Sequence, residues 1–76
     1  MARAYILVHT AVGTTEQVQE SLRHLAGVRE ADIVSGDVDL VVAIDLPSTE
    51  DIGRLVMREL HGIDGIEGTT TYIVVG

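Results

Sequence analysis

Two aspartates, Asp37 and Asp39, stand one residue apart in a short stretch that begins at Ser35 and Gly36. Paired carboxylates can hold an ammonium group, and the N–H groups of a turn can hold a carboxylate, so this stretch could bind a small zwitterion. The same residues also suit an ordinary soluble hairpin turn, because Gly and Asp are favoured there. Both interpretations remain open, and a metal site built on these two carboxylates alone is less favoured than either.

Three consecutive threonines, Thr69 to Thr71, are the second polar feature of interest. Their hydroxyls offer donors and acceptors on both faces of a strand. Threonine is also a common residue of edge strands, so the run needs no function to explain it. The threonines belong to a site only if the Gly36-Asp37 turn lies nearby.

The histidines and serines do not form a catalytic pattern. His24 and His61 fall near the ends of two expected helices, where a cation is favourable, and neither has a second ligand at metal-binding spacing. His9 lies in an expected strand, and an interface position is favoured for it over a catalytic role. Nucleophile-elbow and phosphate-loop motifs are missing and the chain has no cysteine. No catalytic residue, metal or cofactor is therefore predicted.

The composition restricts the classes of partner. The chain has 76 residues, enough for one domain, and its 12 acidic residues against 5 Lys and Arg give a net charge of −7. Such a domain is not expected to bind nucleic acid directly or to attach to an anionic membrane. No apolar run approaches the ~18 residues of a membrane span, and no signal peptide is recognised, so a cytoplasmic location is expected.

The elements that must position these residues follow from hydrophobic periodicity. β-Branched runs predict strands over 3–10, 28–35, 38–45 and 66–75, with a two-residue hairpin turn at Gly36-Asp37. A capping box at Thr14 and Gln17 begins one helix, and Gly27 ends it. Ser48 caps a second helix, which Gly62 ends. The apolar helix stripes comprise Val18, Leu22 and Leu25 in the first helix, and Ile52, Leu55, Val56 and Leu60 in the second.

The resulting order, βαββαβ, is that of two similar halves. Leu25 aligns with Leu60 and Gly27 with Gly62 at an offset of 35 residues. A duplicated βαβ unit predicts the split βαβ, ferredoxin-like α+β sandwich. Right-handed crossovers put both helices on one face of an antiparallel sheet, and the two most apolar strands, the first and third, take its centre.

The opposite face of that sheet should then be uncovered, yet it is apolar. The first strand carries apolar residues on both sides, and the third strand repeats this pattern. A solvated face would alternate with polar residues, so we expect a second copy to cover it, giving a dimeric α/β barrel by sheet-to-sheet pairing. The set Tyr5, Leu7 and His9 contains the polar members and is assigned to this dimer interface.

Four segments, residues 25–31, 34–42, 60–66 and 69–74, carry a resemblance to a known family. The chain resembles the effector-binding domain of the Lrp/AsnC (leucine-responsive, or feast/famine) transcriptional regulators, also called the regulation of amino-acid metabolism domain. The resemblance covers residues 1–76 as a single domain and rests on the Gly-Asp-x-Asp hairpin combined with the threonine-rich last strand.

The resemblance implies a sheet-to-sheet homodimer that assembles further, with an octamer as the expected ring. It also implies that an amino acid binds at a subunit interface near the hairpin. The residues implied for ligand binding are Ser35, Gly36, Asp37, Asp39, Thr69 and Thr71. The family often has Tyr where Val38 stands, so an aromatic wall or hydroxyl is missing from the implied site.

The family's regulators carry an N-terminal helix-turn-helix, whereas this sequence begins directly at the first expected strand. The expectation is a stand-alone effector domain that senses a metabolite without binding DNA, and that could co-assemble with a full-length Lrp/AsnC regulator. The alternative is a small enzyme of the dimeric α/β-barrel type, a monooxygenase or isomerase, with His9 as a base. Such an enzyme would have its pocket within one subunit.

Overall fold

The computed structural model describes residues 1–76 and confirms the predicted order of elements. The elements are β1 (Ala2–Thr10), α1 (Thr15–Arg23), β2 (Val28–Ile33), β3 (Leu40–Leu46), α2 (Thr49–Arg58), a short 3₁₀ turn η1 (Leu60–Gly62) and β4 (Ile66–Ile73). The second, third and fourth strands end earlier or begin later than predicted. The fold is the expected ferredoxin-like α+β sandwich.

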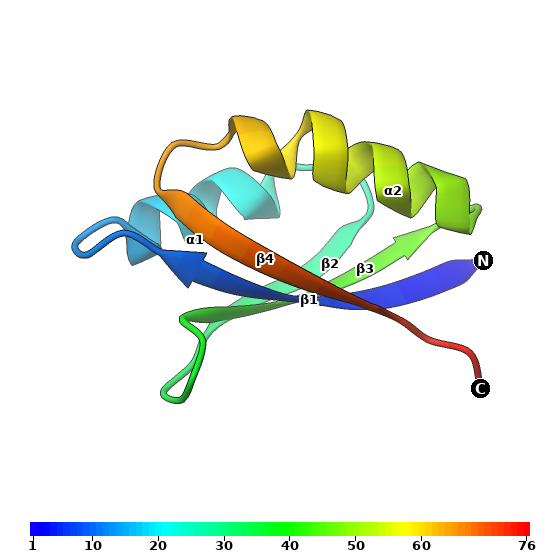
Figure 1. Cartoon of the computed structure of the whole chain (residues 1–76). Coiled ribbons are helices and arrows are strands. Elements are labelled where there is room, and N and C mark those ends of the chain that lie inside the picture. Colours follow the sequence, from blue (N-terminus) through cyan, green and yellow to red (C-terminus); the bar gives the residue numbers. More distant parts are fainter.

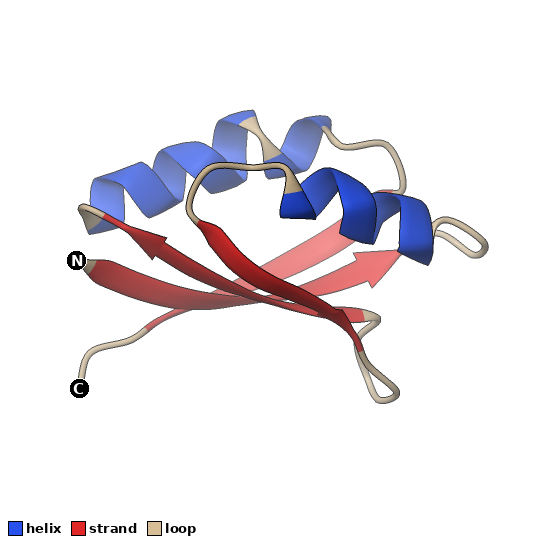
Figure 2. Cartoon of the chain, turned by 180° about the vertical axis from the view of Figure 1, so that it is seen from behind, coloured by secondary structure: helices blue, strands red, loops and turns tan.

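One four-stranded antiparallel sheet forms a complete layer, in the order β2-β3-β1-β4. The two most apolar strands therefore occupy the centre, as predicted. Figure 1 shows both helices above the sheet, and the view from behind in Figure 2 shows nothing but loops on the other side. Neither helix is long and apolar enough to cross a bilayer.

The hydrophobic core lies between the helices and the sheet. Alternate residues of β1 that face the helices, Ala4, Ile6 and Val8, are fully buried. The apolar helix stripes predicted from spacing pack against these β1 residues, with Leu25 and Val56 at the margin of the core. The buried members of the stripes are Val18, Leu22, Ile52, Leu55 and Leu60. Burial of these aliphatic side chains is the main source of the fold's stability.

The two helices begin differently, although both were predicted to have a side-chain cap. Ser48 Oγ accepts a hydrogen bond from Asp51 N at 3.3 Å, which confirms the cap of α2. Thr14 precedes α1, but its hydroxyl donates to Ala11 O at 2.8 Å and caps no helix N–H group. The predicted capping box is therefore wrong, because the hydroxyl closes the preceding loop.

The helix ends also break the symmetry of the two halves. Gly27 has φ +92°, the predicted left-handed conformation that suits glycine, but α1 ends at Arg23 with His24 as its C-cap, so Gly27 does not terminate the helix as predicted. Gly62 has no positive φ and lies in η1, after α2 has ended at Arg58. The left-handed glycine on this side is Gly65, with φ +100°. The prediction that Gly62 terminates α2 is wrong.

The hairpin between β2 and β3 keeps the predicted register but opens earlier. Ile33 pairs with Leu40, which centres the connection on Gly36 and Asp37. Beyond that pair, Val34 N donates to Asp39 O at 3.0 Å. The remaining residues form a loop instead of the predicted two-residue turn between longer strands.

Candidate functional site

The hairpin connection, residues 34–39, presents its polar tip to solvent. Ser35, Gly36 and Asp37 are exposed, and a Cβ added at Gly36 would meet nothing within 4 Å. Figure 1 shows this loop projecting below the sheet, on the side away from the helices. The tip is therefore free to contact a molecule that approaches the uncovered face.

Asp39 holds the base of this loop. Its carboxylate Oδ2 accepts a hydrogen bond from Thr10 N at 2.8 Å, and its own N donates to Val8 O at 2.9 Å. The pairing of β1 with β3 ends at Val8 and Leu40, so the Thr10 N–H, which points to the same side as Val8 O, needs a partner beyond the regular ladder. Asp39 supplies that partner. One of its oxygens is thereby committed, whereas the Asp37 side chain has no hydrogen bond or ion pair.

The threonines predicted beside the hairpin lie on the other side of the sheet. Thr69 pairs with Val8 and Thr71 with Ile6, and both partners are fully buried under the helices. Paired residues of antiparallel strands share a face, so Thr69 and Thr71 point to the helix side and are half-buried. Thr70 pairs with Leu7 on the uncovered face.

The strand β1 also separates these threonines from β3 and its loop. Two strand spacings of about 4.8 Å each set that separation. Thr69 instead borders a hollow of about 300 Å³ with Gly68, Glu67 and His61. One chain therefore does not bring the six predicted residues into one pocket. Sequence reasoning missed Glu67 and His61, because the hollow depends on where η1 meets β4.

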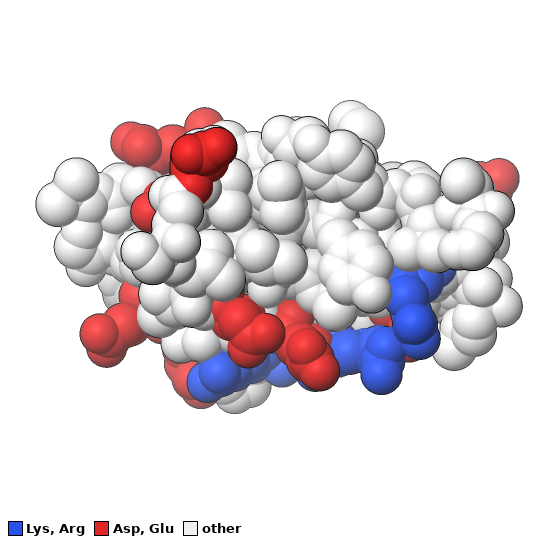
Figure 3. Space-filling model, turned by 90° about the horizontal axis from the view of Figure 1, so that it is seen from below, with Lys and Arg blue, Asp and Glu red and all other residues white.

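The uncovered sheet surface, which we call the open face, is formed by Tyr5, Leu7, Val41, Ala43 and Tyr72 at its centre. The register supports this set, since Tyr5 pairs with both Ala43 and Tyr72, and Leu7 pairs with Val41. Tyr5 is 41% exposed and Tyr72 is 55% exposed. Figure 3 shows a largely uncharged area across this face, with a row of acidic and basic groups along one border and further acidic groups at one corner. An apolar area of this kind marks an interaction surface.

His9 completes the open face near the hairpin, as assigned from the sequence. It is exposed and pairs with Gly68, where an added Cβ would lie 4.0 Å from His9 Cδ2. His9 lines none of the three surface hollows. No group of three or more acidic or imidazole side chains is placed to hold a metal ion.

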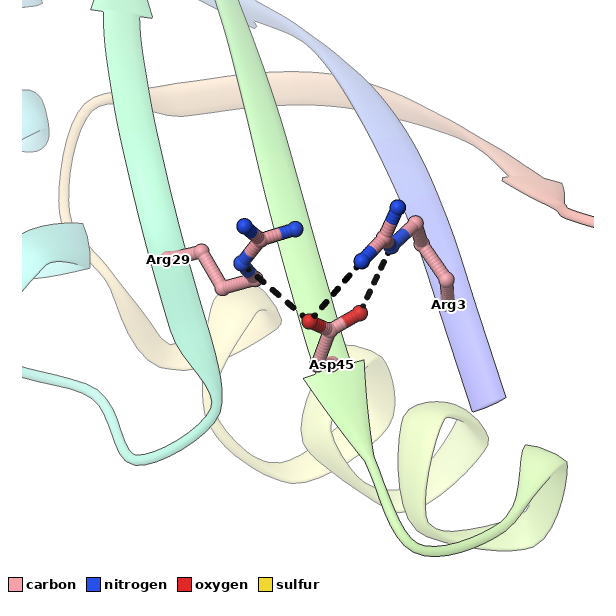
Figure 4. A network of polar contacts seen from close by, with 3 residues as sticks. All are labelled: Arg3, Arg29 and Asp45. Carbon is pink, nitrogen blue, oxygen red and sulfur yellow. Dashed lines mark hydrogen bonds and ion pairs between the residues drawn. The ribbon is translucent and has the colours of Figure 1, made fainter. Parts of the chain in front are cut away.

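An ionic cluster lies at the opposite end of the open face, and sequence reasoning did not identify it. Arg3 Nε donates to Asp45 Oδ1 at 2.9 Å, and Arg29 Nε lies 3.1 Å from Asp45 Oδ2 (Figure 4). The hydrogen bond from Arg3 lowers the pKa of Asp45, with smaller electrostatic help from both guanidiniums, and the same bond raises the pKa of Arg3. The signal that could have revealed this cluster is the register of β1 with β3, which sets Arg3 directly opposite Asp45.

Together, the antiparallel sheet, the helices on one side and the open face define a small ferredoxin-like α+β domain with one uncovered apolar sheet surface. The family model described as the Lrp/AsnC ligand binding domain matches residues 3–76. The chain belongs to this family.

Curated relatives point the same way. An uncharacterized HTH-type transcriptional regulator of Pyrococcus abyssi is 33% identical over 60 residues, which cover 79% of this chain and 40% of that protein. The HTH-type transcriptional regulator FL11 of Pyrococcus horikoshii is 32% identical over 72 residues, or 95% of this chain and 47% of that protein. The chain thus spans less than half the length of these relatives, which are named as transcriptional regulators.

Solved structures share the whole fold. A hypothetical protein from Pyrococcus horikoshii has a TM-score of 0.93 at 31% identity, covering 99% of this chain and 90% of that chain. A transcriptional regulator of Neisseria meningitidis, solved as a complex with L-Met, has a TM-score of 0.88 at 16% identity, covering 99% and 50%. The second likeness concerns the fold alone.

Proposed function

We infer that this domain pairs with a second copy through the open face and senses an amino acid at a subunit interface beside the 34–39 loop. The observation that carries the inference is the open face itself. Its centre is apolar, it lies mainly on the two central strands, and the helices leave it uncovered. Covering it with a second open face would remove that apolar area from water.

The ligand site is proposed between subunits because one chain separates its polar groups. The exposed Asp37 carboxylate is the group for the ligand ammonium, and the N–H groups around Gly36 are the groups for its carboxylate. Thr69 and Thr71 would complete the polar shell from another subunit, with Ser35 at the rim. The regulator of Neisseria meningitidis was solved with L-Met, which supports an amino acid as the ligand class.

The charge of the site selects among amino acids. The chain carries a net charge of −7, and Asp37 and Asp39 lie together at the loop. A ligand with a second carboxylate would be repelled. Neutral amino acids such as methionine and leucine are therefore proposed over aspartate and glutamate.

Larger assembly belongs to the same proposal. Dimers would associate further, with an octamer as the expected ring, and the domain could co-assemble with a full-length Lrp/AsnC regulator. Its role in regulation would then be to make that assembly respond to the bound amino acid, without contacting DNA itself.

Calorimetry with methionine, leucine and glutamate tests the ligand site. Asp37→Ala should weaken binding of the neutral amino acids by about tenfold or more, since hydrogen bonds to charged groups contribute 1.5–3 kcal/mol. Glu50→Ala, an exposed carboxylate at the start of α2, is the matched control and should leave binding unchanged. Undiminished binding in Asp37→Ala would place the site elsewhere.

A further inference from the structure

A separate groove of about 360 Å³ lies on the helix side of the molecule, between α2 and the end of β3. Its apolar lining comes from Leu46, Pro47 and Leu55, with Ala26 from the connection that follows α1. The groove is at the end of β3 opposite to the 34–39 loop, and it does not include any residue of the open face. It is therefore distinct from the proposed amino-acid site.

Two arginines of α2, Arg54 and Arg58, line this groove at a spacing that puts both on one side of the helix. Arg54 Nη1 donates to Asp51 Oδ1 at 2.9 Å, and Asp51 Oδ2 accepts from Ser48 Oγ at 2.9 Å. The Asp51 carboxylate thus already has two partners. Arg58 makes no ion pair or side-chain hydrogen bond.

The free guanidinium of Arg58 is unusual for this chain. Acidic residues outnumber arginines by 12 to 5, and three of the five arginines are paired with carboxylates. The other unpaired arginine, Arg23, lies on α1 and lines no hollow. Arg58 therefore combines an unused planar donor group with a concave apolar surface.

We propose that this groove binds a small monocarboxylate with an aliphatic chain. The Arg58 guanidinium would hold the carboxylate through two parallel N–H···O bonds, with the remaining N–H groups of Arg54 beside it. The chain of the ligand would lie on Leu46, Pro47 and Leu55. A groove of this volume is near the lower limit of about 300 Å³ for small-molecule sites, so the ligand is small.

The other charges of the groove limit the ligand to one negative charge. Asp51 and Glu59 also line it, and both would repel a dicarboxylate or a phosphate. A neutral alcohol would leave the guanidinium without a charged partner. An α-amino acid would bring its ammonium group close to the two guanidiniums, and of the two carboxylates only Glu59 is free to offset that repulsion, because Asp51 already has two partners. The groove thus selects an aliphatic acid over the amino acid of the same skeleton.

The test is an NMR titration of the ¹⁵N-labelled chain with 4-methylpentanoate, followed through the backbone amides. Saturable shifts are expected at Leu46 and along α2 from Asp51 to Glu59. 4-Methylpentan-1-ol, which has the same chain and no charge, and acetate, which has the charge and almost no chain, should each bind at least several-fold more weakly. Leucine should instead shift the backbone amides of residues 34–39. Binding at the two sites is therefore followed through different signals.

The variant pair is Arg58→Gln against Arg23→Gln. Both arginines are exposed, both occupy the last turn of their helix and neither has an ion-pair partner, so the two changes match in charge and helix position. Arg58→Gln should weaken 4-methylpentanoate binding by about tenfold or more, whereas Arg23→Gln should leave it unchanged. Equal weakening in both variants, or shifts spread over the surface without saturation, would overturn the proposal.

Discussion

Asp37 and Asp39 have similar surroundings in the sequence, yet the structure gives them different tasks. Asp39 binds the Thr10 N–H at the base of the loop, whereas Asp37 stands free at its tip. The difference arises because the pairing of β1 with β3 ends at Val8 and Leu40, which leaves the Thr10 N–H outside the ladder. A mutation at Asp39 would therefore confuse ligand binding with stability, and Asp37 is the better probe of the ligand.

Asp39→Ala is expected to lower the free energy of unfolding by about 1–3 kcal/mol, because the nearly buried Thr10 N–H loses its acceptor. Asp39→Asn keeps a side-chain oxygen and should retain most of that stability. Asp37→Ala should stay within about 0.5 kcal/mol of the unmodified chain, as exposed substitutions do. Urea denaturation at one fixed chain concentration measures all three. A loss in Asp37→Ala equal to that in Asp39→Ala would contradict this division.

The Asp45 cluster gives a pH dependence of defined sign. The folded-state pKa of Asp45 lies below its ordinary value of 3.8, chiefly because Arg3 donates a hydrogen bond to it. The unfolded chain therefore takes up this proton first as the pH falls. The stabilising contribution is complete well above pH 3.8 and is lost as the pH falls through the lower folded-state value.

An NMR titration of the Asp45 side-chain carboxyl should thus give a midpoint below 3.8. Arg3→Gln should raise that midpoint more than Arg29→Gln does, because Arg3 contributes the hydrogen bond and Arg29 only a weaker charge effect. The Arg29 variant is the matched control, since both guanidiniums touch the same carboxylate. Equal effects of the two substitutions would show that net charge alone sets this pKa.

At the scale of elements, the periodicity of apolar residues was sufficient to predict the fold. Apolar residues at helical spacing located both core stripes, and the apolar first and third strands were correctly placed at the sheet centre. The element ends were harder to predict, because they depend on tertiary contacts. The Thr14 hydroxyl turned to Ala11 O, and the repeat between the halves did not extend to the backbone of Gly62.

Gly27 and Gly62 therefore respond differently to the same substitution. Gly27 has φ +92°, and an added Cβ would lie 2.5 Å from Leu46 Cδ2 and 3.1 Å from Asp45 O. Gly27→Ala should cost about 1–3 kcal/mol of unfolding free energy. Gly62 has an ordinary φ and open space around it, so Gly62→Ala should be neutral or stabilise by up to about 1 kcal/mol. Thermal unfolding of the two variants compares them, and similar losses would refute the assignment of a left-handed conformation to Gly27 and not to Gly62.

At the scale of the whole molecule, the candidate site was only partly predictable. The hairpin residues were placed at one end of the sheet, as expected. Thr69 and Thr71 face the helix side because strand residues alternate, and their pairing with Val8 and Ile6 fixes that parity. A run of three threonines does not reveal which members face which side. Thr69 and Thr71 can meet the hairpin residues only if a second subunit supplies one of the two groups. A single sequence does not show where that subunit lies.

Assembly through the open face has a direct test in Leu7→Glu. Leu7 is half-buried at the centre of that face, so a glutamate there would bury an unpaired charge in the dimer. Light scattering should give at least twice the chain mass of 8.1 kDa for the unmodified protein and the monomer mass for Leu7→Glu. Glu50→Ala on the helix side should leave the mass unchanged. A folded monomer of the unmodified chain at micromolar concentration would contradict the dimer.

The charges on the open face further predict how the second copy is oriented. A two-fold axis along the strands would set β1 of one subunit over β3 of the other, so that Arg3 faces Asp45 of the partner subunit and Asp45 faces the partner's Arg3. A two-fold axis across the strands would set Asp45 near Asp39 of the partner subunit and would bring the exposed acids of β2, Glu30 and Asp32, toward each other. The first arrangement pairs opposite charges, and we expect it.

A mixing experiment distinguishes the two orientations. The Arg3→Asp chain presents acidic groups at both positions 3 and 45, and the Asp45→Arg chain presents basic groups at both positions. With the axis along the strands, each variant repels its own copy and attracts the other, so native mass spectrometry of the mixture should show heterodimers in excess over the statistical half. Both variants lose the Arg3–Asp45 ion pair within their own chain, and Asp45→Arg also loses the pair with Arg29, so each variant measured alone is the control for the mixture. A statistical mixture would favour the axis across the strands, because Arg3 would then face the partner's His9 end instead of its Asp45.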